Sequence, residues 1–373
     1  MKKVALLILI VIMLMSYSVS YIFADVTTCA KAAIVMDVKT GRVLYSKNAD
    51  QKLAMASTTK IMTTLVAIES GRLSETVTVS KKAAYTEGSS IYLKEGEKIT
   101  VEELLYGIML RSGNDASVAV AEHLGGSVAG FVEMMNAKAK EIGALNTSFA
   151  NPHGLDDPQH YTTAYDLALI TSYALRNAKF ADIVKTKRKT ISGPPDVDWD
   201  RSLMNKNKML WQFDGGDGVK TGYTSKAGRC LVSSATRENW QLCSVVLNCG
   251  PMWEESANLL NYAFKNYTKQ RVVNSSDIYQ QLKVFGGKQD IVGIKPTHDF
   301  YMPIKQAELD KLIFIPALKF NNTAPIVKGS KAGDLKIYLG NEYLGSVELA
   351  YNQSIESKDP MYHFRKIFRS ITD

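Results

Sequence analysis

The spacing of hydrophobic and polar positions changes several times along the chain, and each change predicts a different element. Short apolar runs at 32–36 and 42–45 flank the polar, glycine-containing segment 37–41, which is typical of a β-hairpin. From Ser57 the apolar residues recur at helical spacing and stop at Gly71, so this stretch predicts a helix.

Helical spacing dominates the next part of the chain. Thr100 and Glu103 form a capping box in front of an apolar stretch, and Thr163 with Asp166 forms another N-cap. The segment 111–114 contains Ser, Gly and Asn and interrupts the helical pattern. The helices predicted here cover residues 101–109, about 115–123, 128–142 and about 164–176.

After these helices the pattern changes to short strand-like runs, which one helix closes. The predicted strands cover residues 187–191, 206–210, 218–223, 229–235 and 241–247. A helix then begins at Pro251 and carries its apolar residues on one face. This order predicts an α+β fold, with an antiparallel sheet flanked by helices and a helical lobe. The order of the strands within the sheet is not readable from the sequence.

The C-terminal part of the chain predicts two further units. Short β-like runs separated by Gly and Pro predict a small all-β domain over residues 272–352. In the segment 353–373, Asp359 and Pro360 begin a helix whose apolar side chains share one face against basic ones. Such a helix is typical of a membrane-surface anchor, and the alternatives are a helix packed on the β domain or a frayed tail.

Composition and the N-terminus indicate an exported protein. The chain has 373 residues and a formal net charge of +8, which suits two domains and favours anionic surfaces such as lipid head groups or acidic wall polymers. No basic run contains interleaved aromatic residues, so we expect no nucleic-acid partner. Lys2 and Lys3 precede an apolar run at 4–15, which predicts a signal peptide over 1–24 or, as the alternative, an uncleaved anchor. We expect the following domain, over 25–271, at the outer face of the cytoplasmic membrane.

Two of the four cysteines belong to one predicted hairpin. If 229–235 and 241–247 turn at 237–239, strict alternation places Cys230 and Cys243 on opposite faces of the sheet. We therefore expect no disulfide within this hairpin, and we expect the thiols to be buried as small apolar groups.

One stretch offers a nucleophile and a base within a single helical turn. Ser57 and Lys60 lie three positions apart, so in a helix both side chains project from one face. A serine hydroxyl needs a base within hydrogen-bond reach, and a lysine is such a base only when its pKa is lowered. Burial, a neighbouring positive charge and a helix N-terminus all lower it. A Ser-x-x-Lys tetrad also arises by chance, so its meaning depends on the rest of the chain.

Two further motifs follow in order. Ser112-Gly113-Asn114 interrupts the helical lobe, where a loop can present polar groups to a cleft. Lys220-Thr221-Gly222 lies on a predicted strand, and its glycine allows a substrate backbone to approach closely. Similar triads at 39–41, 46–48 and 256–258 do not follow the order Ser-x-x-Lys, Ser-x-Asn, Lys-Thr-Gly, so we set them aside.

With these motifs in this order, the chain resembles the low-molecular-mass penicillin-binding proteins, the serine D-alanyl-D-alanine carboxypeptidases. The resemblance extends to residues 151–157, 161–168 and 217–224, to the β domain with 325–329, and to the leader and C-terminal helix. It implies a penicillin-binding, transpeptidase-like domain followed by a small all-β domain.

The resemblance implies a role for each residue near the nucleophile. Ser57 would attack the carbonyl of a D-Ala–D-Ala bond and form an acyl-enzyme, and Lys60 would take its proton. Ser112 would pass a proton to the leaving nitrogen, and Asn114 would hold the substrate amide. Water would then release the acyl group. The implied partners are the pentapeptide stems of peptidoglycan and β-lactam antibiotics, which connects the protein to peptidoglycan biosynthesis and cell shape.

The strand motif has implied roles as well. Lys220 and Thr221 would hold the terminal carboxylate of the substrate, with Gly222 leaving room for its backbone. The backbone N–H groups of Ser57 and Tyr223 would form an oxyanion hole. Some family members carry His at the position of Tyr223, and some carry an Arg after the penultimate strand that this chain lacks. The carboxylate contact therefore depends on the strand motif.

Other functions compete with this interpretation. A class A β-lactamase needs a glutamate for fast deacylation, and the segment 141–146 resembles that region with one residue too many. A catalytically inactive wall-binding or scaffolding protein would keep the same fold. A metal-dependent peptidase is disfavoured, because the five histidines show no ligand spacing, so we expect neither a metal nor another cofactor. We interpret His153, between Pro152 and Gly154, as a residue that orders a loop.

Overall fold

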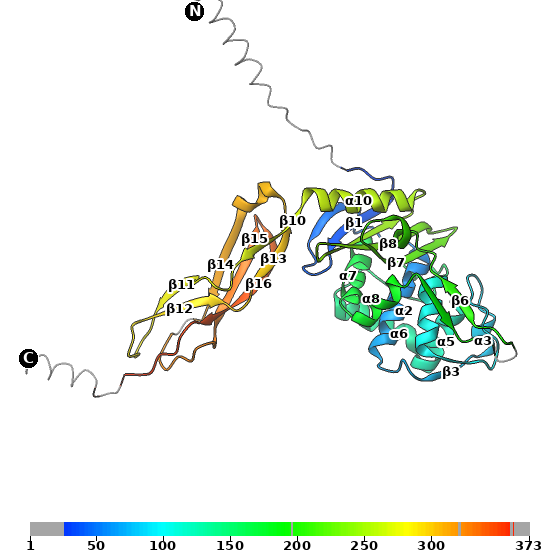
Figure 1. The fold of residues 1–373 in the computed structure, drawn as a ribbon, viewed down its shortest axis with the longest axis horizontal. Coiled ribbons are helices and arrows are strands. Elements are labelled where there is room, and N and C mark those ends of the chain that lie inside the picture. Colours follow the sequence, from blue (N-terminus) through cyan, green and yellow to red (C-terminus); the bar gives the residue numbers. More distant parts are fainter. Residues whose placement is uncertain (1–25, 195–196, 320–321, 359–360, 362–373) are drawn as a thin grey trace, which may run out of the picture.

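The structure is a computed structural model that describes residues 26–194, 197–319, 322–358 and 361. The predicted signal peptide and, apart from Met361, the predicted C-terminal helix lie outside these residues. Within the described part of the chain, no helix combines the length and the apolar character that crossing a membrane requires. Figure 1 shows a larger α+β unit and an elongated β unit, and the chain passes from one to the other after α10 (Met252–Asn266).

A five-stranded antiparallel sheet forms the centre of the larger unit. Its order is β2-β1-β9-β8-β7, so the N-terminal hairpin pairs with a strand that ends about 200 residues later. The strands are β1 (Ala32–Asp37), β2 (Val43–Lys47), β7 (Gly216–Thr224), β8 (Gly228–Arg237) and β9 (Trp240–Leu247). Successive side chains of β8 point into two different cores on the two faces of the sheet. Val232 packs with the helical lobe, and Leu231 packs with α10. The predicted α+β class and the predicted N-terminal hairpin are confirmed.

The helical lobe lies between β2 and β7 in the sequence and covers the face of the sheet opposite α10 (Figure 1). Its helical segments are η1 (Ala56–Thr59), α2 (Lys60–Glu69), α3 (Lys81–Ala84), α4 (Val101–Tyr106), the π-helical turn η2 (Gly107–Arg111), α5 (Asn114–Gly125), α6 (Val128–Ile142), α7 (Ala164–Leu175), α8 (Ala178–Lys185) and α9 (Met209–Gln212). Two short ribbons complete it, β3 (Thr76–Thr78) with β4 (Lys98–Thr100) and β5 (Arg188–Ile191) with β6 (Arg201–Met204).

Local capping explains where several of these helices begin. The Thr100 hydroxyl accepts the Glu103 N–H at 3.2 Å, and the Glu103 carboxylate accepts the Thr100 N–H at 3.2 Å, so the predicted capping box is confirmed. The predicted cap formed by Thr163 and Asp166 is also confirmed, at 3.0 Å. Helix α8 and the ribbon of β3 and β4 were not predicted.

The predicted strand at 206–210 is wrong. The Asn205 side chain accepts the Asn207 N–H at 2.9 Å, and the Asn207 side chain accepts the Met209 N–H at 3.0 Å. Such local bonds hold the backbone in a turn rather than in an extended ladder. The chain therefore bends here and enters the short helix α9.

The predicted placement of Cys230 and Cys243 on opposite faces is also wrong. The hairpin of β8 and β9 turns through two residues, Glu238 and Asn239, which have φ of 49° and 59°. A two-residue turn pairs Ser234 with Cys243, and this register places Cys230 and Cys243 in the same core. All four cysteines are free among the described residues, and the Cys29 and Cys249 sulfurs lie 3.7 Å apart.

The second unit has its own core, as the sequence predicted for an all-β domain. A ribbon of β10 (Thr268–Val273) and β13 (Phe300–Ile304) lies beside a five-stranded sheet in the order β11-β12-β16-β15-β14. The strands of that sheet are β11 (Gln280–Lys283), β12 (Ile291–Pro296), β14 (Leu312–Leu318), β15 (Lys331–Leu339) and β16 (Glu342–Tyr351). Apolar residues that alternate along these strands, such as Leu335 and Val347, fill a cluster separate from those of the first unit.

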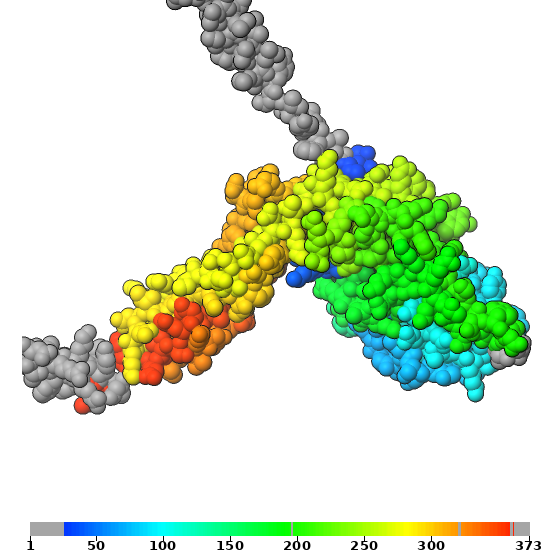
Figure 2. Space-filling model, viewed as in Figure 1, coloured from blue at the N-terminus to red at the C-terminus, as the bar shows by residue number. Residues whose placement is uncertain are grey.

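The two units meet at one end of each, as the space-filling view in Figure 2 shows. Arg42, just before β2, donates to the Pro303 carbonyl and at 3.0 Å to each carboxylate oxygen of Glu308 in η3 (Gln306–Lys311). The Arg42 guanidinium also lies 5.6 Å from the centre of the Tyr267 ring. A buried ion pair therefore connects the N-terminal hairpin to the β unit.

Candidate active site

Ser57 and Lys60 lie at the junction of η1 and α2. In a 3₁₀ turn, side chains three positions apart stand one above the other, so the short η1 aligns these two. The Lys60 ammonium nitrogen, Nζ, lies 3.0 Å from Ser57 Oγ. The serine hydroxyl thus has a nitrogen base at hydrogen-bond distance.

The Lys60 side chain is fully buried, and its ammonium nitrogen has several polar partners. Its Nζ donates to Asn114 Oδ1 at 2.7 Å and to the His153 carbonyl at 2.5 Å. Burial holds the pKa of Lys60 well below its ordinary value, and the charges of Lys220 and Lys206 lower this pKa further, against the opposing effect of Asp115. The amine is therefore available in its neutral form.

Two glycines lie very close to the backbone on both sides of Ala56 and Ser57. A Cβ on Gly154 would lie 2.0 Å from the Ala56 carbonyl oxygen and 2.9 Å from the Ser57 nitrogen, and Gly154 has φ of +92°. A Cβ on Gly222 would lie 3.0 Å from both the Met55 carbonyl oxygen and the Ser57 nitrogen. The turn η1 is therefore held between the segment around Gly154 and strand β7, and neither position has room for a side chain.

Two largely buried histidines lie next to η1 and the start of α2. The His160 Nε2 lies 2.7 Å from the Thr59 hydroxyl, and the His160 Nδ1 accepts the Ala150 N–H at 3.0 Å. Burial lowers the pKa of His153 to about 3 and that of His160 to about 4, so both rings are neutral at pH 7. His153 accepts the Leu155 N–H at 3.2 Å, which agrees with the predicted loop-ordering role. The residue pattern alone did not indicate that His160 belongs to this site.

The second motif follows the π-helical turn η2. Ser112 ends that turn in the left-handed region, with φ of 66°, and its side chain is buried. The Asn114 side chain donates from Nδ2 to the Glu87 carbonyl at 2.6 Å while its oxygen faces Lys60. The structure therefore brings Asn114 next to Lys60, with the buried Ser112 two residues before it at the end of η2.

Strand β7 supplies the third motif. The Lys220 side chain is 2% exposed, and its Nζ donates to the Thr221 carbonyl at 2.9 Å. Burial lowers the pKa of Lys220 to about 7, with a contribution from the charge of Lys206. Tyr223 is 67% exposed, so its side chain points away from the packed interior, and Gly222 lies against η1.

A third lysine belongs to the electrostatics of this site and was missed in the sequence. Lys206 lies in the segment that was predicted as a strand, and its N–H donates to the Leu110 carbonyl at 3.2 Å, next to the end of η2. Burial and Arg111 lower the pKa of Lys206 itself. Lys206 and Lys220, whose charges also lower the pKa of Lys60, give the site a cationic character that suits an anionic substrate.

The side chains around Ser57 differ from a set of metal ligands. Among the residues that the structure describes, no group of three or more His, Cys, Asp or Glu side chains could hold a metal ion. The polar groups that gather at Ser57 are instead a hydroxyl, amines and an amide, a set that suits nucleophilic acyl transfer.

Comparison with known proteins gives a consistent family assignment. A family model described as D-alanyl-D-alanine carboxypeptidase matches residues 20–250, and one described as penicillin-binding protein 5, C-terminal domain, matches residues 267–357. The D-alanyl-D-alanine carboxypeptidase DacF of Bacillus subtilis (strain 168) is 35% identical over 373 residues, which cover 95% of each chain. DacC of Escherichia coli (strain K12) is 33% identical over 88% of this chain and 84% of its own.

Solved structures agree with this assignment. Penicillin binding protein 5 from Haemophilus influenzae superimposes with a TM-score of 0.75 and 30% identity, over 90% of this chain and 99% of that one. A peptidoglycan synthesis regulatory factor (PBP3) from Streptococcus pneumoniae gives a TM-score of 0.76 and 28% identity, over 89% of this chain and 100% of that one.

Proposed function

The chain belongs to the D-alanyl-D-alanine carboxypeptidase family, and we propose that Ser57 is its nucleophile and Lys60 its general base. The resemblance predicted from the motifs is confirmed at the level of the family: the protein is a serine hydrolase that acts on peptidoglycan stem peptides and binds β-lactams. The roles of its individual residues are our proposal.

The surroundings of the Lys60 nitrogen support its role as base. A neutral amine has two N–H groups and one lone pair. Asn114 Oδ1 and the His153 carbonyl accept at 2.7 and 2.5 Å and occupy the two N–H groups, so the lone pair is left for the Ser57 hydroxyl at 3.0 Å. This single arrangement carries the proposal, because it explains how an ordinary serine becomes nucleophilic.

The reaction then follows from the positions of the groups. Ser57 Oγ bonds to the carbonyl carbon of the penultimate D-alanine, and its proton passes to Lys60. The C–N bond to the terminal D-alanine breaks as a proton passes from Lys60 through Ser112 to the leaving nitrogen. Asn114 holds the substrate amide. Water later attacks the acyl carbon and restores the Ser57 hydroxyl.

The strand motif orients the substrate in this scheme. Lys220 and Thr221 bind the terminal carboxylate, and the cationic surroundings attract it. The backbone N–H groups of Ser57 and Tyr223 receive the developing oxyanion. Removing one such donor typically costs about 3–4 kcal/mol of transition-state stabilisation.

Labelling with a fluorescent penicillin tests the nucleophile. We expect Ser57→Ala to lose all labelling and all release of D-alanine while its thermal unfolding stays close to that of the wild type. Ser46→Ala, in the Ser46-Lys47-Asn48 triad, is the matched control, because Ser46 is exposed, and it should label normally.

Mass spectrometry of the wild-type adduct should locate it on the peptide that contains Ser57. Retained labelling of Ser57→Ala would identify another nucleophile, and hydrolysis of penicillin within seconds would favour a β-lactamase.

We also propose that the protein is exported and held at the outer face of the cytoplasmic membrane. The signal peptide over 1–24 and the amphipathic segment within 353–373 support this, and the domain limits 25–271 and 272–352 belong to the same proposal. Deleting residues 361–373 should move the protein from the membrane fraction to the soluble fraction without loss of activity on a soluble peptide. Continued membrane binding would mean that another part of the chain is the tether.

A further inference from the structure

The loop between α3 and β4, residues 85–97, lies directly against the second motif. The Ser89 carbonyl accepts the Asn114 N–H at 2.7 Å, and the Glu87 carbonyl accepts the Asn114 side chain at 2.6 Å. A Cβ on Gly88 would lie 2.7 Å from the Asn114 amide nitrogen. The position of Asn114 therefore depends on where this loop lies.

The loop also packs on the break in front of Asn114. A Cβ on Gly113 would lie 3.3 Å from the Ile91 side chain, and the Ile91 side chain also closely approaches Gly107. Asp115 accepts the backbone N–H groups of Ile91 and Leu93 at 3.0 and 3.1 Å, and the Ser90 hydroxyl at 2.6 Å. These contacts tie the loop to the residues that follow Ser112.

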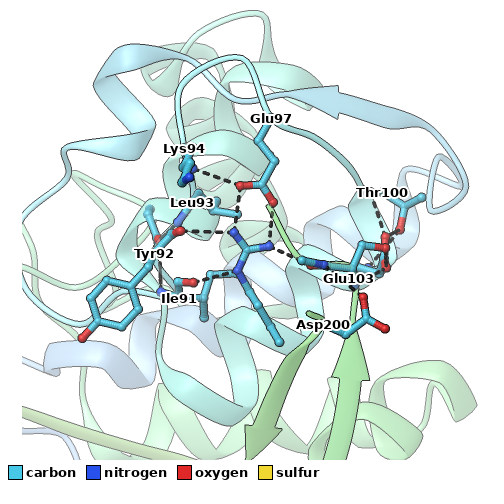
Figure 3. A network of polar contacts seen from close by, with 12 residues as sticks. Ile91, Tyr92, Leu93, Lys94, Glu97, Thr100, Glu103 and Asp200 are labelled. Atoms are coloured by element: carbon cyan, nitrogen blue, oxygen red, sulfur yellow. Dashed lines mark hydrogen bonds and ion pairs between the residues drawn. The ribbon is translucent and has the colours of Figure 1, made fainter. Parts of the chain in front are cut away.

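The loop itself is largely exposed, so something else must fix its path. Residues 87–89 are exposed, and Tyr92 is 82% exposed with φ of 61°. In this loop only Ile91, Leu93 and Glu97 are buried, so few apolar contacts hold it. Figure 3 shows the polar network in which these residues meet.

Arg201, the first residue of β6, lies at the centre of that network. Its guanidinium forms two bonds with the Glu97 carboxylate, at 2.6 and 2.8 Å, and both side chains are almost fully buried. The same guanidinium donates to the carbonyls of Ile91 at 2.9 Å and Tyr92 at 3.1 Å, and to that of Ser192 at 2.7 Å. All five N–H groups of a guanidinium have fixed directions, so one arginine can fix several carbonyls at once.

We propose that Arg201, paired with Glu97, is a positioning residue for acylation: it fixes the 85–97 loop, and the loop fixes Ser112 and Asn114. This inference rests on the proposed roles of Ser112 and Asn114. None of the Arg201 hydrogen bonds described above reaches either of them, so it acts through its bonds to Ile91, Tyr92 and Glu97 of the loop. Lysine cannot replace it fully, because an ammonium is a point charge that does not match the fork of carboxylate and carbonyl acceptors.

The test compares Arg201→Gln with Arg42→Gln. Arg42 also belongs to a buried arginine–glutamate pair, but one that joins the two units and lies outside the site. Both variants should lose thermal stability. At a temperature at which both are folded by circular dichroism, Arg201→Gln should acylate with penicillin ten- to a hundredfold more slowly, as expected for small misplacements of a reacting site. Arg42→Gln should acylate at the wild-type rate, and Arg201→Lys should recover part of the loss.

Ser90→Ala keeps the inference testable if Arg201→Gln does not fold. It removes the bond from the Ser90 hydroxyl to Asp115 and the bond that this hydroxyl accepts from the Tyr92 N–H at 2.7 Å, and it should slow acylation by a smaller factor with little change in stability. Wild-type acylation rates in both Arg201→Gln and Ser90→Ala, or equal losses in Arg201→Gln and Arg42→Gln, would overturn the inference. Ser112→Ala and Asn114→Ala separate it from the proposed function: if these two acylate normally, the site assignment itself fails.

Discussion

Lys60 and Lys220 are both buried, yet the proposed reaction needs them in opposite protonation states. Lys60 must be neutral in order to take the Ser57 proton, and Lys220 must be charged in order to hold a carboxylate. Burial lowers the pKa of both, well below the ordinary value for Lys60 and to about 7 for Lys220. Burial thus favours the neutral amine that Lys60 needs, and the loss of the Lys220 charge at a pH of about 7 sets an upper limit to the useful pH range.

The first prediction concerns this upper limit. As pH rises through about 7, the free protein loses the Lys220 charge, so the second-order rate of acylation by a penicillin with a free carboxylate should fall. The limiting slope is about tenfold for each pH unit, because one proton is lost. Stopped-flow or quench measurements from pH 6 to 9 would check this.

A penicillin methyl ester is the matched control for that profile. It has no carboxylate for Lys220 to hold, so its acylation rate should be lower and should not show the decline above pH about 7. The same decline for acid and ester would mean that another group causes it.

The second prediction concerns the stability cost of Lys220. Its pKa falls from 10.5 to about 7 on folding, a difference on the order of 4–5 kcal/mol in folding free energy. The penalty is full below pH about 7, where both states carry the proton, and it disappears as pH rises to 10.5, where neither does. Lys220→Met should therefore raise the free energy of unfolding by up to that amount at pH 6.5, and by much less at pH 9.5, while it abolishes activity.

Urea unfolding at both pH values measures this difference. The exposed Lys226 provides the control, since Lys226→Met should change stability by a similar small amount at both. An equal gain for Lys220→Met at the two pH values would show that packing, rather than charge, produces it.

At the scale of residues, the sequence predicted most of the site and missed the groups that act at a distance. The order of the three motifs singled out Ser57, Ser112 and Lys220, and the fold brings their segments together. Lys206 and His160 were missed, because their contribution is a charge or a buried hydrogen bond that arises only when distant segments pack. Spacing along the chain contains no such information.

At the scale of elements, the turn η1 and its neighbours determine where the nucleophile lies. The segment around Gly154 and strand β7 approach η1 from two sides, closely enough that a Cβ at 154 would overlap the Ala56 carbonyl. The Thr63 hydroxyl donates to the Pro152 carbonyl at 2.6 Å and fixes that segment on α2. The position of Ser57 is therefore set by backbone packing rather than by its own side chain.

The third prediction tests this packing with two glycines of the same conformation. Gly154 and Gly143 have φ of +92° and +91°, but a Cβ on Gly143 would meet only the Leu169 side chain, at 3.8 Å. Both alanine variants carry the cost of a left-handed residue, about 1–2 kcal/mol. Only Gly154→Ala should also displace Ser57, so we expect it to lose acylation by about a hundredfold or more.

Thermal unfolding and penicillin labelling of both variants separate the two effects. Gly143→Ala should be somewhat less stable and fully active. If Gly154→Ala acylates as fast as Gly143→Ala, the turn can move without consequence and the packing argument fails.

Elements with strong local signals were predicted well, and those decided by tertiary contacts were not. The capping box at Thr100 and the amphipathic pattern at 128–142 are encoded locally, and both helices begin where the sequence indicates. The predicted hairpin register was wrong, because the turn contains two residues instead of three. The shorter turn shifts one strand by one position against the other, and this shift moves each of its side chains to the opposite face of the sheet. Helix α8 was missed, although Asn177 caps it.

At the scale of the whole molecule, the two units are joined by the direct passage from α10 to β10 and by polar contacts between them. Arg42 is the main polar connection, and the Lys269 ammonium of β10 adds one bond, to the Asn239 carbonyl at 2.9 Å. The Arg42 and Glu308 side chains are 5% and 19% exposed, so the pair is largely shielded from water. Loss of one partner would leave a buried charge unpaired.

The fourth prediction follows from this connection. Arg42→Gln and Glu308→Gln should each weaken the attachment of the β unit by about 3 kcal/mol, because breaking a buried pair costs more than breaking an exposed one. Scanning calorimetry should then resolve two separate transitions, with the penicillin-stabilised transition assigned to the larger unit.

Glu356→Gln removes an exposed ion pair with Lys288 and should leave the calorimetric profile unchanged. Because the groups around the proposed nucleophile Ser57 and its partner Lys60 come from the larger unit, and neither Arg42 nor Glu308 is among them, both Arg42→Gln and Glu308→Gln should still label with penicillin at the wild-type rate. A variant that keeps one transition would show that the remaining contacts, such as the bond from Lys269 to the Asn239 carbonyl, are enough to couple the units. A slower rate of labelling would show that the β unit influences the site.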